Sequence, residues 1–122
     1  METKLVDGAI AGWPDPTSRS AWNNLWYDLN GAQVGLAVRG RWIQRAGVLH
    51  MMRRVRNLRW FHETQDRDRA HLIPAIFAEL DCLFSSLVVA HLEDGRPDLS
   101  QQTFRTWRCL SPIRGDLRRI AA

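Results

Sequence analysis

The segment from Ile73 to Leu92 constrains the fold more than any other, because its apolar residues recur at helical spacing. Most of these residues are large and aliphatic or aromatic, and they form one broad stripe: Ile73, Ile76, Phe77, Leu80, Leu83, Phe84, Leu87, Val88 and His91. Such a stripe predicts the central core helix of a globular protein. The opposite side carries small residues, Ala75, Ala78, Cys82 and Ser85, which we expect to let another helix approach closely.

A first helix is predicted to begin at Thr17 or Ser18, whose hydroxyl groups suit an N-cap. It continues through a second apolar stripe made of Trp22, Leu25, Trp26 and Leu29. Gly31 is a suitable C-terminal stop. Residues 32–40 alternate like a short strand, but no second strand pattern exists to pair with them. We therefore interpret residues 32–40 as a loop or an extension of the helix.

Helical spacing also predicts a helix from about Arg41 to His62, and Ser100 suits the N-cap of another that reaches about Leu110. Ser111 and Pro112 are expected to end this helix, before a short terminal turn. With 122 residues the chain fits one domain. The predicted fold is all-α: a compact single-domain bundle of four or five helices spans residues 17–122, after an irregular N-terminal lead-in at residues 1–16.

Positive charge is concentrated in one part of the chain. From Leu29 to His62 there is no Asp or Glu, whereas seven arginines occur: Arg39, Arg41, Arg45, Arg53, Arg54, Arg56 and Arg59. The whole chain has a net charge of +4, so the remainder outside this segment sums to −3. This distribution indicates a patch that binds an anionic partner.

Within the predicted helix 41–62, the apolar residues fall inside an arc of about 80° and five arginines inside a separate arc of about 120°. The arginines of this arc are Arg41, Arg45, Arg53, Arg56 and Arg59, and Trp42 and Trp60 fall near its edge. Arg54 falls towards the apolar side instead. The alignment requires that Gly47 does not break the helix.

Three interpretations of this arginine face remain open. Its guanidinium groups are suited to phosphate, and Trp42 or Trp60 is suited to stacking on an unpaired base. The same residue types also dominate protein interfaces, which would fit an acidic protein surface. Alternatively, the tryptophans close the edge of the core and the arginines pair with Glu63, Asp66 and Asp68.

The segment Leu99-Ser100-Gln101-Gln102-Thr103-Phe104-Arg105-Thr106-Trp107 resembles the recognition-helix region of repressor-type helix-turn-helix domains. This resemblance implies that Gln101, Gln102 and Thr103 contact base edges in the major groove, and that Arg105 and Arg108 contact phosphates. It covers about a quarter of the chain. The same letters also suit an ordinary capped helix start.

No pattern in the sequence indicates catalysis, a metal site or a cofactor, so we expect a protein that is not an enzyme. His62 and His91 fall on apolar faces and are expected in the core. Cys82 and Cys109 are far apart in sequence, which is typical of buried thiols in a reducing compartment. No stretch approaches the roughly 20 apolar residues that span a membrane. We therefore predict a cytoplasmic protein without a membrane partner.

These features predict a small nucleic-acid-binding protein, specifically a DNA-binding regulator acting as a homodimer. The alternative is a protein-interaction module, an adaptor or inhibitor of the kind that mobile elements encode, which binds an acidic protein surface. The sequence leaves open whether the partner is DNA, RNA or protein.

Overall fold

The computed structural model describes residues 16–121, and every regular element in this range is helical. The elements follow the order α1 (Pro16–Val38), α2 (Trp42–Thr64), the 3₁₀ turn η1 (Ala70–Leu72), α3 (Ile73–Glu93), α4 (Pro97–Arg108) and α5 (Leu110–Ala121). The predicted all-α bundle is therefore confirmed. The lead-in predicted for residues 1–16 lies outside the described residues except for Pro16, which already belongs to α1.

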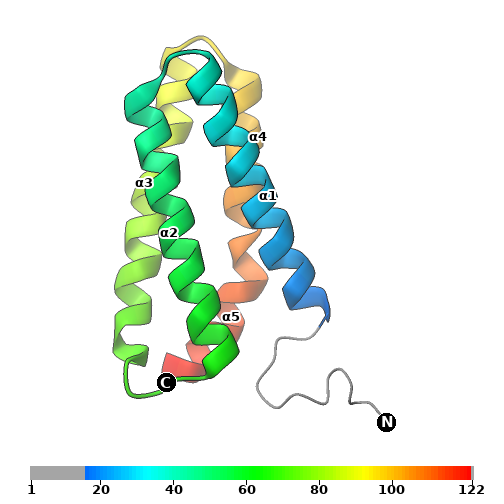
Figure 1. Cartoon of the computed structure of the whole chain (residues 1–122), viewed down its shortest axis with the longest axis vertical. Coiled ribbons are helices and arrows are strands. Elements are labelled where there is room, and N and C mark those ends of the chain that lie inside the picture. Colours follow the sequence, from blue (N-terminus) through cyan, green and yellow to red (C-terminus); the bar gives the residue numbers. More distant parts are fainter. Residues whose placement is uncertain (1–15, 122) are drawn as a thin grey trace.

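The helices form two layers (Figure 1). Helices α1 and α2 pack side by side in one layer, and α3 and α4 pack antiparallel in the other. Contacts between α2 and α3 join the layers along one side. Only Cys109 separates α4 from α5, and α5 then contacts α1, α2 and α3 at the end of the bundle.

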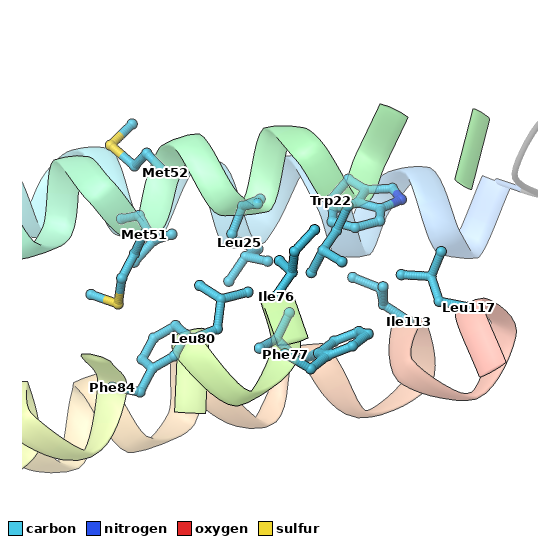
Figure 2. Packing of buried hydrophobic residues seen from close by; sticks show 14 of the residues in the cluster. Trp22, Leu25, Met51, Met52, Ile76, Phe77, Leu80, Phe84, Ile113 and Leu117 are labelled. Atoms are coloured by element: carbon cyan, nitrogen blue, oxygen red, sulfur yellow. The ribbon is translucent and has the colours of Figure 1, made fainter. Parts of the chain in front are cut away.

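The core lies between the layers and is filled by the predicted apolar stripes. Figure 2 shows Trp22 and Leu25 of α1 facing Ile76 and Leu80 of α3. Helix α5 contributes to the same core, because its residues Ile113 and Leu117 are buried beside Trp22. Burial of these stripes is the main stabilising contribution to the bundle.

Helix α1 is longer than predicted. It passes through Gly31 and ends at Val38, so the predicted stop at Gly31 is wrong and the helical extension of residues 32–38 is correct. Leu36 is buried in the core, and this burial stabilises the added turns. The chain instead turns at Gly40, whose φ of 70° is left-handed. The Arg41 N–H donates to the carbonyl of Leu36 at 2.8 Å, which completes a Schellman motif.

Helix α2 begins at Trp42 and runs without a break through Gly47, as the arginine face requires. Helix α4 begins at Pro97, four residues earlier than an N-cap at Ser100 predicts, so Ser100 is not its N-cap. The Ser100 hydroxyl donates to the Val88 carbonyl at 3.1 Å and ties α4 to α3. Pro112 does not end a helix either: it lies in the first turn of α5, where its missing N–H removes no hydrogen bond.

Two smaller expectations also change. The small residues on the outer side of α3, Ala75, Ala78, Cys82 and Ser85, are all exposed, so no helix of the described chain covers them. Cys82 is thus not a buried thiol, and it is not bonded to Cys109.

By length and composition, the segment Ala70–Glu93 could cross a membrane, with a mean hydropathy of 1.9 in its most apolar window. The expectation that no stretch has this character is therefore wrong. One such helix indicates little, because the core helix of a bundle passes the same test. Absence of a membrane partner stays a prediction.

Candidate nucleic-acid interface

The two layers differ in charge. Helices α1 and α2, together with the turn that joins them, contain eight arginines and two carboxylates, Asp28 and Glu63. Helices α3, α4 and α5, together with the turn between α3 and α4, contain six arginines and six carboxylates. The net positive charge of the described bundle therefore resides on the α1–α2 layer.

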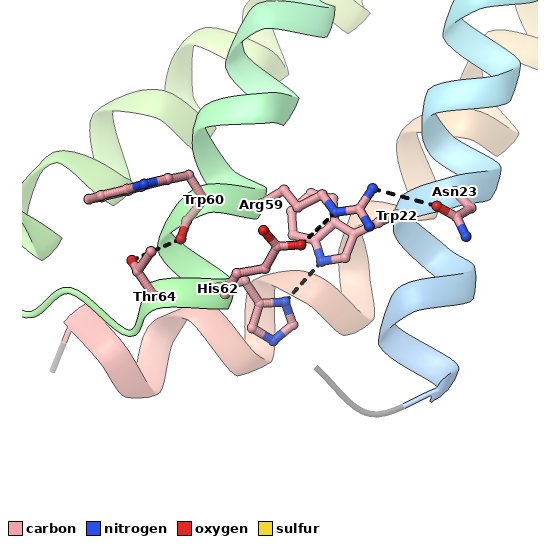
Figure 3. A network of polar contacts seen from close by, with 7 residues as sticks. Trp22, Asn23, Arg59, Trp60, His62 and Thr64 are labelled. Atoms are coloured by element: carbon pink, nitrogen blue, oxygen red, sulfur yellow. Dashed lines mark hydrogen bonds and ion pairs between the residues drawn. The ribbon is translucent and has the colours of Figure 1, made fainter. Parts of the chain in front are cut away.

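Three arginines of α2 point across to α1. The Arg45 Nε donates to the Gln33 side-chain carbonyl at 2.9 Å. The Arg56 guanidinium lies 5.4 Å from the centre of the Trp26 ring, a cation–π contact. Arg59 lies beside Asn23 and also pairs with Glu63 at 3.0 Å (Figure 3). These contacts hold the three cations in a row along the seam between the two helices.

A groove of about 370 Å³ opens on this seam. Aromatic, amide and guanidinium groups line it: Trp22, Trp26, Tyr27, Asn23, Asn30, Arg56 and Arg59, together with Val55. Tyr27 is 79% exposed, whereas Trp22 forms the floor and is buried. The groove thus offers flat apolar rings beside donors suited to phosphate, the combination found in proteins that bind unpaired nucleic acid.

Neither carboxylate of the layer is free to repel an anion at this groove. Glu63 is engaged by the Arg59 guanidinium, as described above. The Asp28 carboxylate faces the other layer, where it lies 3.5 Å from the Thr106 hydroxyl of α4. The seam is therefore positive overall, and Arg56 has no carboxylate partner among the described residues.

The remaining predicted residues of α2 spread over three directions. Arg53 is exposed on the outer surface. Arg41 pairs with Asp94 at 3.2 Å, at the turn between α3 and α4. Trp42 is 61% exposed beside Arg45, near the turn between α1 and α2. Trp60 is half-exposed and contacts Arg69, on a separate groove between α2 and α3. Arg45, Arg56 and Arg59 therefore form the part of the predicted face that lies on the seam, and Arg53 is exposed on the same helix.

Arg54 faces α3, as its position off the arginine arc predicted. It forms an ion pair with Glu79 at 2.6 Å, and the His50 ring also binds that carboxylate at 2.6 Å. The hydrogen bond from His50 and the charge of Arg54 lower the pKa of Glu79. Of the pairing that we considered between the arginine face and Glu63, Asp66 and Asp68, the described residues show only Arg59 with Glu63, at 3.0 Å. Asp66 pairs instead with Arg69 of the connector, at 4.0 Å.

The C-terminal segment does not have the geometry of a helix-turn-helix. Figure 1 shows α3 and α4 as an antiparallel hairpin, whereas the two helices of that motif cross at roughly 90–120°. Thr103 is only 7% exposed, and its hydroxyl donates to the Leu99 carbonyl at 2.9 Å. The expectation that Thr103 contacts a base edge is therefore wrong. Gln101, Gln102, Arg105 and Arg108 are exposed, but on the layer opposite α2.

The groove residues Trp26, Tyr27 and Asn23 were not predicted. Trp26 belongs to the apolar stripe of α1, which assigned it to the core, yet it is only half-buried. Tyr27 lies 100° further around the helix than Trp26 and so points away from the apolar stripe. This position was the one signal in the sequence that Tyr27 is exposed.

No carboxylate hydrogen-bonds to His71 or His91 within the described residues, and His71 is exposed. His62 and His91 are buried, as predicted. The same part of the chain holds no group of three or more His, Cys, Asp or Glu side chains that could bind a metal ion. No protein-family model, curated protein sequence or solved structure matches this chain.

Proposed function

We propose that this protein binds nucleic acid through the α1–α2 layer. The observation that carries this proposal is the separation of charge between the layers, with the net positive charge on α1 and α2. Phosphate attraction supplies most of the non-specific affinity of such proteins. The α2 arginines from Arg45 to Arg59 span about 21 Å, the length of about six nucleotides in a strand stacked at a rise of about 3.4 Å.

The groove favours unpaired bases over a duplex. Trp26 and Tyr27 offer rings on which a base stacks, and Arg56 and Arg59 lie beside them for the neighbouring phosphates. Reading of duplex DNA by α4 has less support, because Thr103 is buried and α4 belongs to the neutral layer. A regulatory role and a homodimer stay predictions.

The test is fluorescence anisotropy with labelled single-stranded RNA, single-stranded DNA and duplex DNA at low salt. We expect both single strands to bind more tightly than the duplex. Replacing Arg53, Arg56 and Arg59 by glutamine should weaken binding at least tenfold, because three phosphate contacts are lost.

Two control variants make this result specific. The triple variant Arg67→Gln, Arg118→Gln and Arg119→Gln removes the same charge from exposed positions outside α1 and α2, and should bind almost as the parent does. The double variant Arg105→Gln and Arg108→Gln tests α4. If the α4 variant loses affinity while the α2 variant does not, the interface lies on α4 and the proposal is wrong.

A second candidate function, binding to an acidic protein surface, is favoured by one observation. Val38, Trp42 and Ile43 are 82%, 61% and 87% exposed at the turn between α1 and α2. Exposed large apolar residues beside arginines are typical anchors of protein interfaces. Pull-down from a nuclease-treated lysate, with Ile43→Asp as control, separates the two functions. An acidic protein that the parent retains and the variant loses would support this candidate, and loss of all partners would favour nucleic acid.

A further inference from the structure

A second cavity, distinct from the groove between α1 and α2, lies where α1, α3 and α4 meet. Its volume is about 100 Å³. The residues of α1 that line it run from Asp28 to Arg39, about 16 Å along the helix axis at 1.5 Å per residue, so this small volume is elongated along α1. Small residues on α1, Gly31, Ala32 and Gly35, leave the space that a larger side chain would fill.

His91 is the buried polar group of this cavity. Its side chain is 4% exposed, it lines the cavity, and no other described residue hydrogen-bonds to its imidazole. Its nitrogens are not among the fully enclosed polar atoms that lack a partner, so water or a ligand in the cavity can reach them. Burial and the nearby Arg39 charge lower the pKa of His91, so the ring is neutral at pH 7 and keeps one N–H donor.

Arg39 lines the cavity at the end where His91 lies. Its guanidinium folds back along α1, where a Cβ on Gly35 would lie 3.5 Å from its Nη1. Arg39 forms no ion pair with any described carboxylate: Asp94 pairs with Arg41 and Asp98 with Arg96. One end of the cavity therefore presents two hydrogen-bond donors, one of them a permanent cation.

Much of the cavity lining is apolar and comes from Leu29, Phe84, Leu87 and Leu99. Its remaining polar lining comes from Gln102, Thr103 and Thr106 of α4 and from Asp28 of α1. An engineered protein cavity of about 150 Å³ holds benzene, so a cavity of this size accommodates a slender body of about four carbons.

We propose that this cavity binds a small, unbranched organic carboxylate, with the carboxylate held by Arg39 and His91 and the carbon chain between Phe84 and Leu87. Guanidinium and imidazole N–H groups are complementary to a carboxylate, and the narrow apolar space excludes branched bodies. The site is independent of the α1–α2 groove and does not rest on nucleic-acid binding.

The test is a titration of the intact chain with pentanoate as the probe, monitored by ¹H–¹⁵N NMR. We expect saturable shifts confined to the cavity residues of α1, α3 and α4. Two matched compounds define the recognised chemistry: 1-pentanol lacks the charge, and 2,2-dimethylpropanoate has the same carbon count in a wider shape. Both should bind at least tenfold more weakly.

Variants test whether Arg39 and His91 bind the carboxylate of pentanoate. Because Arg39 is exposed, Arg39→Gln should leave the fold intact. It should weaken pentanoate binding about tenfold, because one charged hydrogen bond is lost. His91→Phe should act in the same direction, and Arg67→Gln, in the connector, should have no effect. Absence of saturable binding to the parent, equal affinity for 1-pentanol, or an unchanged affinity of Arg39→Gln would each overturn the proposal.

Discussion

Trp22 links three helices through one buried side chain. Its indole N–H donates to the Nδ1 of His62 at 2.9 Å, and the other ring nitrogen of His62 lies 3.5 Å from Asp116 of α5. The sequence predicted that Trp22 and His62 are buried, since both fall on apolar stripes. It could not predict that they bind each other, because 40 residues separate them along the chain.

Replacing Trp22 by phenylalanine tests this link. The variant keeps an aromatic ring but leaves the His62 nitrogen without its donor, so we expect the free energy of unfolding to fall by about 1–3 kcal/mol. Urea denaturation measures the change. Trp60→Phe is the matched control, because Trp60 is half-exposed, and it should change stability by less than about 0.5 kcal/mol. Equal losses in both variants would show that the hydrogen bond contributes nothing.

Tyr27 tests base stacking at the groove. Because its side chain is largely exposed, Tyr27→Ala should leave the thermal unfolding temperature almost unchanged. Stacking contributes about 1–3 kcal/mol per base, so affinity for single-stranded RNA should fall about 5- to 150-fold. Affinity for duplex DNA should change little, since paired bases are not available to the ring. An equal loss for both nucleic acids would contradict a stacking role.

At the scale of the element, the wide apolar stripes predicted α2 and α3 well. A stripe specifies which residues must be buried together, and burial is what stabilises a helix in a protein. Local signals were less reliable. Gly31, Ser100 and Pro112 each suit a helix end, yet all three lie within helices, because tertiary packing outweighs the small preference of one residue.

The candidate site was predictable only in part. Helical spacing aligned Arg45, Arg53, Arg56 and Arg59 correctly, because they belong to one uninterrupted helix. The groove depends on how α1 packs against α2, and periodicity within each helix does not define that packing. The same reason explains the error at Thr103: a local motif does not determine the angle at which α4 packs on α3.

Substitutions at two glycines test where the helices continue and where they end. Gly47 lies within α2 with open space around its missing Cβ, so Gly47→Ala should raise the free energy of unfolding by about 0.5–1 kcal/mol. Gly40 has a left-handed φ of 70°, so Gly40→Ala should lower it by about 1–2 kcal/mol. Chemical denaturation measures both changes. A loss of stability in Gly47→Ala would show that the uninterrupted α2 is wrong.

The whole molecule is a bundle with one basic and one neutral layer. The neutral layer has as many carboxylates as arginines, and Asp81 accepts hydrogen bonds from Trp107 and Arg114 at 2.8 Å each. The basic layer leaves Arg53 and Arg56 without carboxylate partners among the described residues. This asymmetry suggests a molecule that presents one face to a long anion, with the cavity near His91 in its interior.

The salt dependence of binding to single-stranded RNA tests this central claim most directly, because it counts the phosphates neutralised. If Arg45, Arg53, Arg56 and Arg59 each contact a phosphate, the logarithm of the binding constant should fall with the logarithm of salt concentration with a slope of about −3. The variant that lacks the last three arginines should give a slope of about −0.7. A slope near zero for the parent, or the same steep slope for parent and variant, would contradict the assignment of the α1–α2 layer as the binding face.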